Sequence, residues 1–304
     1  MTAKTSKPNK TAPGAAWPVI LAYLVSFLLV VFAALLMLYS TLGSKNYMQG
    51  QVRSSGFSAT AYKAMSEDFT SYAASTGFST ETLTGVLSQQ QIETDMNDAI
   101  AKMYAGDTTY NGRAEIGQAA YDAMELEAGN RGLTLEGDTA TAVQTVAEAM
   151  RQEYAGYTAL PLASQIHTLI QKLNKVTWIG LAVCAVFLVL AVVLLFRLSG
   201  GDLRLGVRCL VYALGGAVVV CFVLGLAITP LMGLQRFSLN PPAYKDFVIS
   251  YISGMFGRFN LFGTIYLVLG ALLGALFMPR KGRPAKRYVM DANNYPIEEE
   301  EPRR

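Results

Sequence analysis

Three carboxylates close together in the sequence, Glu93, Asp95 and Asp98, are the first candidates for a chemical site. Oxygen ligands of this type hold a divalent cation when several of them converge on one point. On a helix, residues 95 and 98 share a face, whereas residue 93 does not join them. The spacing therefore favours a solvated helix face over a cation site, and we predict no bound metal.

The other side chains that enzymes use as nucleophiles or bases are sparse. The single histidine, His167, has no acidic residue close to it in the sequence, so a serine hydrolase would lack an oriented base. The cysteines, Cys184, Cys209 and Cys221, all lie in apolar stretches and offer no zinc or thiolate site outside them. The phosphate-binding pattern G-x-x-x-x-G-K-[ST] does not occur. We therefore predict a protein that is not an enzyme and binds no cofactor.

The apolar stretches dominate the composition. Hydrophobic residues make up 52% of the chain and charged residues only 15%, which is low for a soluble protein. A helix needs roughly 20 residues to cross about 30 Å of hydrocarbon. Four windows without a charged residue exceed that length: 11–44, 176–196, 209–235 and 259–279. We predict four transmembrane helices, and the first is too long for a cleaved signal peptide, so we expect an uncleaved anchor.

Basic residues near the ends of these helices predict their orientation. They gather before the first helix, between the second and third, and after the fourth. Four spans put these segments on one side, which the positive-inside rule makes the cytoplasmic side of the plasma membrane. Segment 43–175 is then external, with nine basic and fifteen acidic residues and a net charge of −6. Because the basic residues already serve as topogenic flanks, we predict no nucleic-acid partner.

The predicted fold class is an all-α membrane protein with four transmembrane helices and an extracytoplasmic helical bundle between spans 1 and 2. The predicted order is a disordered cytoplasmic N-terminus (1–16), transmembrane helix 1 (17–42), the extracytoplasmic helical domain (43–175), transmembrane helix 2 (176–198), a cytoplasmic turn (199–207), transmembrane helix 3 (208–229), an external loop with an amphipathic helix (230–258), transmembrane helix 4 (259–279) and a cytoplasmic tail (280–304).

Apolar residues recur at helical spacing within the external segment. They predict helices over about 58–75, 88–105 and 112–128 and another from residue 138, with Gly77 after the first and Gly106 after the second. Ser88 and Gln91 match a capping box. From Leu162 the pattern continues without a breaker into the second span. It predicts one helix to about Leu198, which would couple the external domain rigidly to the membrane.

Small residues in spans 3 and 4 predict close helix packing. In span 3 they recur four apart, and span 4 contains a G-x-x-x-G pair; the predicted packing positions are Cys209, Ala213, Ala217, Cys221, Gly225, Gly263, Gly270 and Gly274. Two interpretations remain open, packing within one protomer and an interface between copies of the chain.

Two further segments are candidate contact sites. Residues 244–256 form an amphipathic helix that lies in the outer interface, packs beneath the external domain or offers a partner groove; the predicted positions are Tyr244, Phe247, Tyr251 and Met255. The basic start of the tail either binds anionic lipid headgroups or serves only as topogenic charge; its residues are Arg280, Lys281, Arg283, Lys286 and Arg287.

Part of the external segment resembles that of uncharacterised membrane proteins of Gram-positive, clostridial-type bacteria. The residues that carry this resemblance are Ser75, Thr76, Gly77, Phe78, Val86, Leu87, Ile92, Asp95, Ile100, Tyr104 and Gly106. That family implies no activity. The order of span, large external domain and three further spans is also similar to FtsX and MacB-like permease subunits, and this likeness implies a cytoplasmic ATPase partner.

These observations predict a non-enzymatic, multi-pass bacterial membrane protein. Its external helical domain would bind, sense or scaffold at the cell envelope, with the lipid bilayer and either an envelope protein or a second copy of the chain as partners. The alternative is a permease-like subunit that couples a cytoplasmic ATPase to the outside.

Overall fold

The computed structural model describes residues 16–107, 109, 115–199, 203–231, 241–277, 288–290 and 296–298. Helices make up nearly all of this part: α1 (Ala16–Thr41), α2 (Lys45–Ser54), α3 (Phe57–Thr76), α4 (Thr80–Thr84), α5 (Gln89–Ala105), α6 (Glu115–Asn130), α7 (Asp138–Thr158), α8 (Ala163–Leu198), α9 (Leu203–Leu231) and α10 (Pro242–Phe277). Two short strands, β1 (Tyr288–Met290) and β2 (Pro296–Glu298), pair antiparallel with Tyr288 opposite Glu298. They fall in the segment predicted as a tail.

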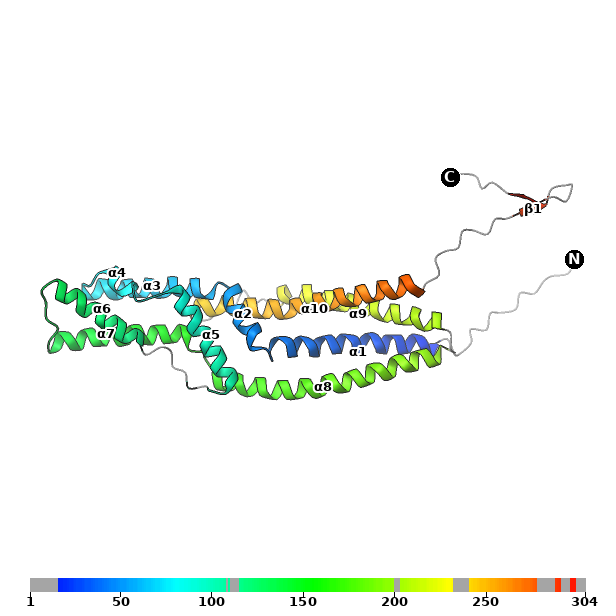
Figure 1. The fold of residues 1–304 in the computed structure, drawn as a ribbon, viewed down its shortest axis with the longest axis horizontal. Helices are drawn as coiled ribbons and strands as arrows, with labels where there is room; N and C mark the ends of the chain where they lie inside the picture. The colour runs from blue at the N-terminus through cyan, green and yellow to red at the C-terminus, as the bar shows by residue number, and fades with distance from the viewer. Residues whose placement is uncertain are drawn as a thin grey trace.

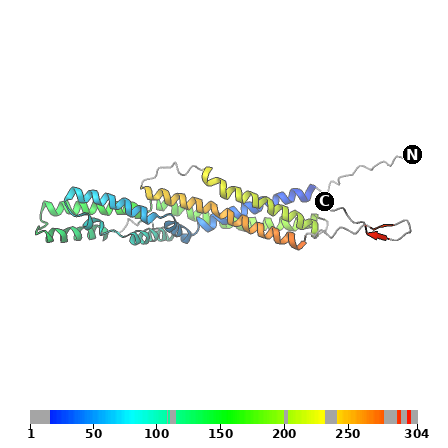
Figure 2. The same cartoon turned by 90° about the horizontal axis from the view of Figure 1, so that it is seen from above.

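Four helices, α1, α8, α9 and α10, are long and apolar enough to cross a membrane. The four predicted spans therefore correspond to four helices of suitable length and composition, and the chain has a multi-pass, membrane-like helical architecture. The four helices, here called the membrane bundle, lie side by side in one half of an elongated molecule (Figures 1 and 2). The start of α1, the end of α8, the start of α9 and the end of α10 lie at the same end of the bundle (Figure 1).

Helices α2–α7, residues 45–158, form the other half of the molecule and are here called the head. They enclose an apolar core whose fully buried members include Met65, Phe69, Ile92, Met96, Met124 and Met150. These residues lie on the helical stripes read from the sequence, so the stripes are confirmed as buried faces. Burying one such side chain contributes roughly 1.5–3 kcal/mol, so the core accounts for much of the stability of the head.

The helix ends in the head follow the sequence in some places and not in others. Gly77 and Gly106 end α3 and α5 with φ of 77° and 93°, a conformation that glycine adopts without strain. The capping box predicted at Ser88 is wrong, because the Ser88 side chain makes no capping hydrogen bond. The Gln91 side chain donates to Asp95 Oδ1 at 2.7 Å instead of reaching back to the helix start.

Two long helices join the head to the membrane bundle. Helix α8 runs from Ala163 to Leu198 without interruption, as predicted. The separate amphipathic helix and fourth span predicted over 230–258 and 259–279 are instead a single 36-residue helix, α10. The reason lies in its sequence: Pro242 occupies the first position, where proline is tolerated, and no later proline breaks the helix before Phe277. At 1.5 Å per residue, each of these helices is about 54 Å long.

Candidate functional site

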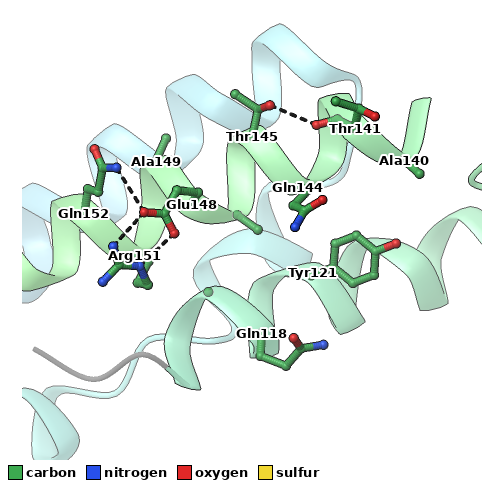
Figure 3. A pocket seen from close by; sticks show the side chains of 12 residues that line it. Gln118, Tyr121, Ala140, Thr141, Gln144, Thr145, Glu148, Ala149, Arg151 and Gln152 are labelled. Carbon is green, nitrogen blue, oxygen red and sulfur yellow. Dashed lines mark hydrogen bonds and ion pairs between the residues drawn. The ribbon is translucent and has the colours of Figure 1, made fainter. Parts of the chain in front are cut away.

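An open groove between α6 and α7 has a volume of about 930 Å³. The two helices approach closely at its base, where a Cβ added to Gly117 would lie 3.2 Å from the Cβ of Arg151. Figure 3 shows Tyr121 on α6 and Gln144 on α7 at the facing sides of the two helices. The groove also includes Gln118, Ala140, Thr141, Thr145, Ala147, Glu148, Ala149 and Gln152.

Most charges in this groove are already paired. Arg151 donates to Glu148 through Nε at 2.7 Å and Nη2 at 2.6 Å, and Gln152 donates to the same carboxylate at 3.0 Å (Figure 3). These hydrogen bonds lower the pKa of Glu148 to about 2. Apart from this ion pair, the groove presents amides, hydroxyls and one aromatic ring for contact with a ligand. Such a lining suits a neutral, hydrogen-bonding ligand, and its residues include no histidine, cysteine or lysine that could act as a base or nucleophile.

A contact between two carboxyl side chains joins α3 to α7. The Glu153 carboxyl on α7 faces the Asp68 carboxyl on α3, with which it interacts by charge and hydrogen bonding. Burial raises the pKa of Glu153, and the charge of Asp68 and this hydrogen bond raise it further. The pKa of the neighbouring Tyr157 is also raised, first by burial and then by Glu153 and Asp68. The protonation state of Glu153 is therefore coupled to this interface between α3 and α7.

The three carboxylates singled out in the sequence do not converge. Asp95 is 1% exposed and accepts hydrogen bonds from the Tyr154 hydroxyl at 2.6 Å and from Gln91. Glu93 pairs with Arg53 of α2 at 3.0 Å, while Asp98 is exposed. The sequence pattern missed the inward orientation of Asp95, which ties α5 to α7 inside the core. No group of three potential metal ligands occurs among the residues that the structure describes.

The lone histidine lies where α5 ends against α8. His167 is half-buried, and a Cβ added to Gly106 would lie 3.5 Å from its Nε2. The imidazole therefore packs at a helix junction.

The predicted packing positions of α9 lie inside the membrane bundle. Cys209, Ala213, Ala217, Cys221 and Gly225 are all buried. On α10, a Cβ at Gly263 would lie 3.4 Å from the Cβ of Cys221, and one at Gly270 would lie 3.6 Å from the Cβ of Leu214. A Cβ at Gly225 would overlap the side-chain oxygen of Asn260. These contacts favour packing within one protomer for most of the row.

Gly274, the last predicted packing position, behaves differently. Nothing lies within 4 Å of the place where its Cβ would stand. Its predicted role in packing has no counterpart in the contacts within the chain, and an interface between copies stays a prediction there.

The predicted interface aromatics on α10 contact the head. Tyr244 and Phe247 are buried in the core of the head, against Phe57, with ring centroids 5.4 and 6.1 Å from it. Tyr251 and Met255 are half-buried. Of the three placements open in the sequence, the structure therefore favours packing beneath the head. The predicted lipid-headgroup residues Arg280, Lys281, Arg283, Lys286 and Arg287 lie outside the described residues.

The chain matches no family model, no curated protein and no solved structure. The likeness to clostridial-type membrane proteins and to permease subunits gains no support from these comparisons. Functional inference therefore rests on the geometry of the chain itself.

Proposed function

We propose that the chain is a non-enzymatic bacterial envelope protein whose head binds or senses a component of the cell surface. Two observations together carry this proposal. The head has an open, polar groove, and two continuous helices, α8 and α10, anchor the head to the membrane bundle. A binding surface held in this way stays at a fixed height above the bilayer.

Hydrogen bonds support the rigidity of this attachment. The Tyr244 hydroxyl of α10 donates to the carbonyls of Tyr157 and Ala159 at 3.0 Å each, at the end of α7. Tyr47 of α2 donates to the carbonyl of Tyr251 at 3.2 Å. The head is thus held to α10 at two levels, and a force on the head reaches the membrane helix directly.

The positive-inside distribution supports an external head. The helix ends far from the head adjoin the three basic segments of the sequence, and by the positive-inside rule this supports a cytoplasmic location for those ends. Labelling intact cells with a membrane-impermeant maleimide tests it on the variant Thr145→Cys. Labelling is expected before lysis, because Thr145 is exposed in the groove. Labelling only after lysis would reverse the orientation.

Binding through the groove is tested by photocrosslinking in the native cell. A photoreactive residue in place of Gln144 should capture an envelope component, whereas the same residue in place of exposed Thr70 on α3 should not. Equal adducts from both positions, or none from Gln144, would contradict a role for the groove.

A permease-like subunit is the second candidate, and the length of α8 and α10 favours it, because such helices can transmit motion across the membrane. A pull-down of the tagged protein in mild detergent separates the two proposals. Recovery of a stoichiometric cytoplasmic ATPase would support the permease, and its absence would support the binding protein.

A further inference from the structure

An aromatic pair marks the head-side boundary of the membrane bundle. Tyr39 near the end of α1 and Trp178 on α8 meet edge to face, with ring centroids 6.2 Å apart, and they are 44% and 62% exposed. Exposed Tyr and Trp rings favour the level of lipid headgroups. Beyond Trp178, the exposed side chains of α8 are apolar as far as Leu194, while those before it are largely polar. Hydrocarbon therefore meets water at this pair.

Three parts of the chain converge just on the head side of the pair. The turn after α1 lies so close to α8 that a Cβ on Gly43 would overlap the side-chain oxygen of Asn174. Tyr104, near the end of α5, donates its hydroxyl to the carbonyl of Leu42 in the same turn at 2.8 Å. Burial raises the pKa of Tyr104 to about 12, so the phenol stays protonated and keeps donating. The turn, α5 and α8 thus form one surface that meets the bilayer.

Lysines line this surface. Lys172 and Lys175 are exposed and precede Trp178 by two turns and one turn of α8, or about 9 and 4.5 Å along the helix axis. Lys45, also exposed, is the first residue of α2 and follows the same turn. We call these three residues the lysine collar. Lys102, in the last turn of α5, also lies in this region, but its charge acts on Asp107.

The lysine collar lacks compensating acids. The sequences of α1, α2 and α8 contain no acidic residue. None of the ion pairs between described residues involves a collar lysine. Most acidic residues of the head lie on α3, α4, α5, α6 and α7, while Asp107 follows α5 and Glu136 precedes α7. Although the head has a net negative charge, the lysine collar is therefore a positive band at the level where phosphates of the bilayer would lie.

We propose that the lysine collar binds the headgroups of anionic phospholipids, such as phosphatidylglycerol, in the leaflet on the head side. Ammonium groups at this depth can each contact a lipid phosphate, while Trp178 and Tyr39 pack against the adjoining glycerol and upper acyl chain. This binding fixes the depth and tilt of α8, and with it the height of the head. It does not depend on the ligand of the head.

The position of these lysines argues against a purely topogenic role. If the head is external, as proposed above, the positive-inside rule disfavours lysines next to the spans on that side. Three exposed lysines without acids therefore need another function, and lipid phosphate is the anion present at that level.

The two tryptophans of the chain allow a direct test. In the variant Trp17→Phe, Trp178 alone reports on the lipid beside the collar. The full-length variant is reconstituted into mixed bilayers, and fluorescence quenching by brominated phosphatidylglycerol is compared with quenching by brominated phosphatidylcholine. We expect a preference for phosphatidylglycerol of roughly a hundredfold, which falls roughly fivefold for each lysine replaced by glutamine and is lost when all three are replaced.

A matched control uses a lysine away from the collar. In the Trp17→Phe background, Lys172→Gln should lower the preference, whereas Lys63→Gln, an exposed lysine on α3, should leave it unchanged. Far-UV circular dichroism and size-exclusion profiles confirm that each variant folds. Equal quenching by the two lipids, a preference that survives the triple substitution, or an equal loss in Lys63→Gln would overturn the proposal. So would displacement of phosphatidylglycerol by millimolar inorganic phosphate, which would indicate a site for free anions.

Discussion

The head and the membrane bundle place apolar residues in opposite ways. The head buries large side chains such as Phe69 and Met150 and exposes polar ones. The membrane bundle buries many small residues, including Ala33, Ala213 and Ala217, and exposes large ones, such as Phe27 at 65%. Both regions are helical, so the difference comes from the solvent each one meets. Water makes burial of large apolar surface favourable, whereas in hydrocarbon close backbone packing is what remains to be gained.

The largest expected effect contrasts a phenylalanine in each region. Phe69→Ala should destabilise the head by about 3–5 kcal/mol, because it removes a fully buried ring and leaves a cavity. Phe27→Ala, on the lipid-facing side of α1, should change stability little. Hydrogen exchange of the full-length protein in detergent measures both, and a large loss of protection in Phe27→Ala would contradict the assignment of that face to lipid.

In the membrane bundle, the most harmful change should be the replacement of a small packed residue by a large one. Gly263→Leu would force a side chain into Cys221 and Phe222, whose nearest atoms lie 3.4 Å from the added Cβ, and we expect a cost of about 1–3 kcal/mol. Gly274→Leu is the matched control, because its Cβ meets nothing within 4 Å. Thermal unfolding in detergent should show a lower midpoint only for Gly263→Leu. If Gly274→Leu alone lowered the midpoint or changed the oligomeric state, an interface between copies would be indicated at that position.

An effect of similar size tests the connection between the two regions. Tyr244→Phe keeps the buried ring but leaves two carbonyls, those of Tyr157 and Ala159, without their donor. The cost is about 1–3 kcal/mol. Hydrogen exchange should increase at the end of α7 and at the start of α10, while the far end of α10 stays protected. Uniform loss of protection along α10 would mean that the contact supports the whole bundle and not only the attachment of the head.

The smallest effect is a pH dependence confined to the head. The raised pKa of Glu153 means that the folded state favours the protonated acid, so its contribution is full at low pH and is lost as pH rises through the raised pKa. The stability of the head should therefore increase as the pH is lowered from neutral to about 4.5. Because Glu153 is partly exposed, solvent screening keeps the change below about 1 kcal/mol.

Glu153→Gln should stabilise the head at neutral pH and remove this dependence. The control Glu148→Gln acts with the opposite sign. Because the pKa of Glu148 is lowered to about 2, its carboxylate contributes stability at pH values above the ordinary pKa of a glutamate, and this contribution is lost as the pH falls toward 2. Thermal unfolding across pH 2 to 7 distinguishes the two variants, and an unchanged pH profile in Glu153→Gln would remove the carboxyl pair as its cause.

Local patterns were sufficient for much of the fold. Charge-free length predicted the four membrane helices, and helical spacing predicted which faces of α3, α5, α6 and α7 are buried. The unbroken pattern after Leu162 predicted α8 within one residue. These predictions succeeded because they depend on composition and periodicity, which act over a few turns.

The candidate sites depended on contacts that local patterns do not contain. The groove between α6 and α7 combines residues from two helices, and no motif within either helix indicated it. Asp95 was read as part of an exposed face, yet the hydroxyl of Tyr154, on a helix distant in the sequence, holds it in the core. The boundary between the external loop with its amphipathic helix (230–258) and the fourth span (259–279) was drawn where composition changes from amphipathic to apolar, but α10 continues across it.

The sequence by itself determined that this chain has four helices long and apolar enough to cross a membrane and which face of most helices is apolar, because hydrophobicity and its period are properties of neighbouring residues. Only the tertiary structure decided what each face contacts. It placed Tyr244 and Phe247 in the core of the head and brought the turn at Gly43, which precedes α2, against Asn174 of α8. Periodicity states that a face is apolar or charged, but the partner of that face is set by packing between segments far apart in the chain.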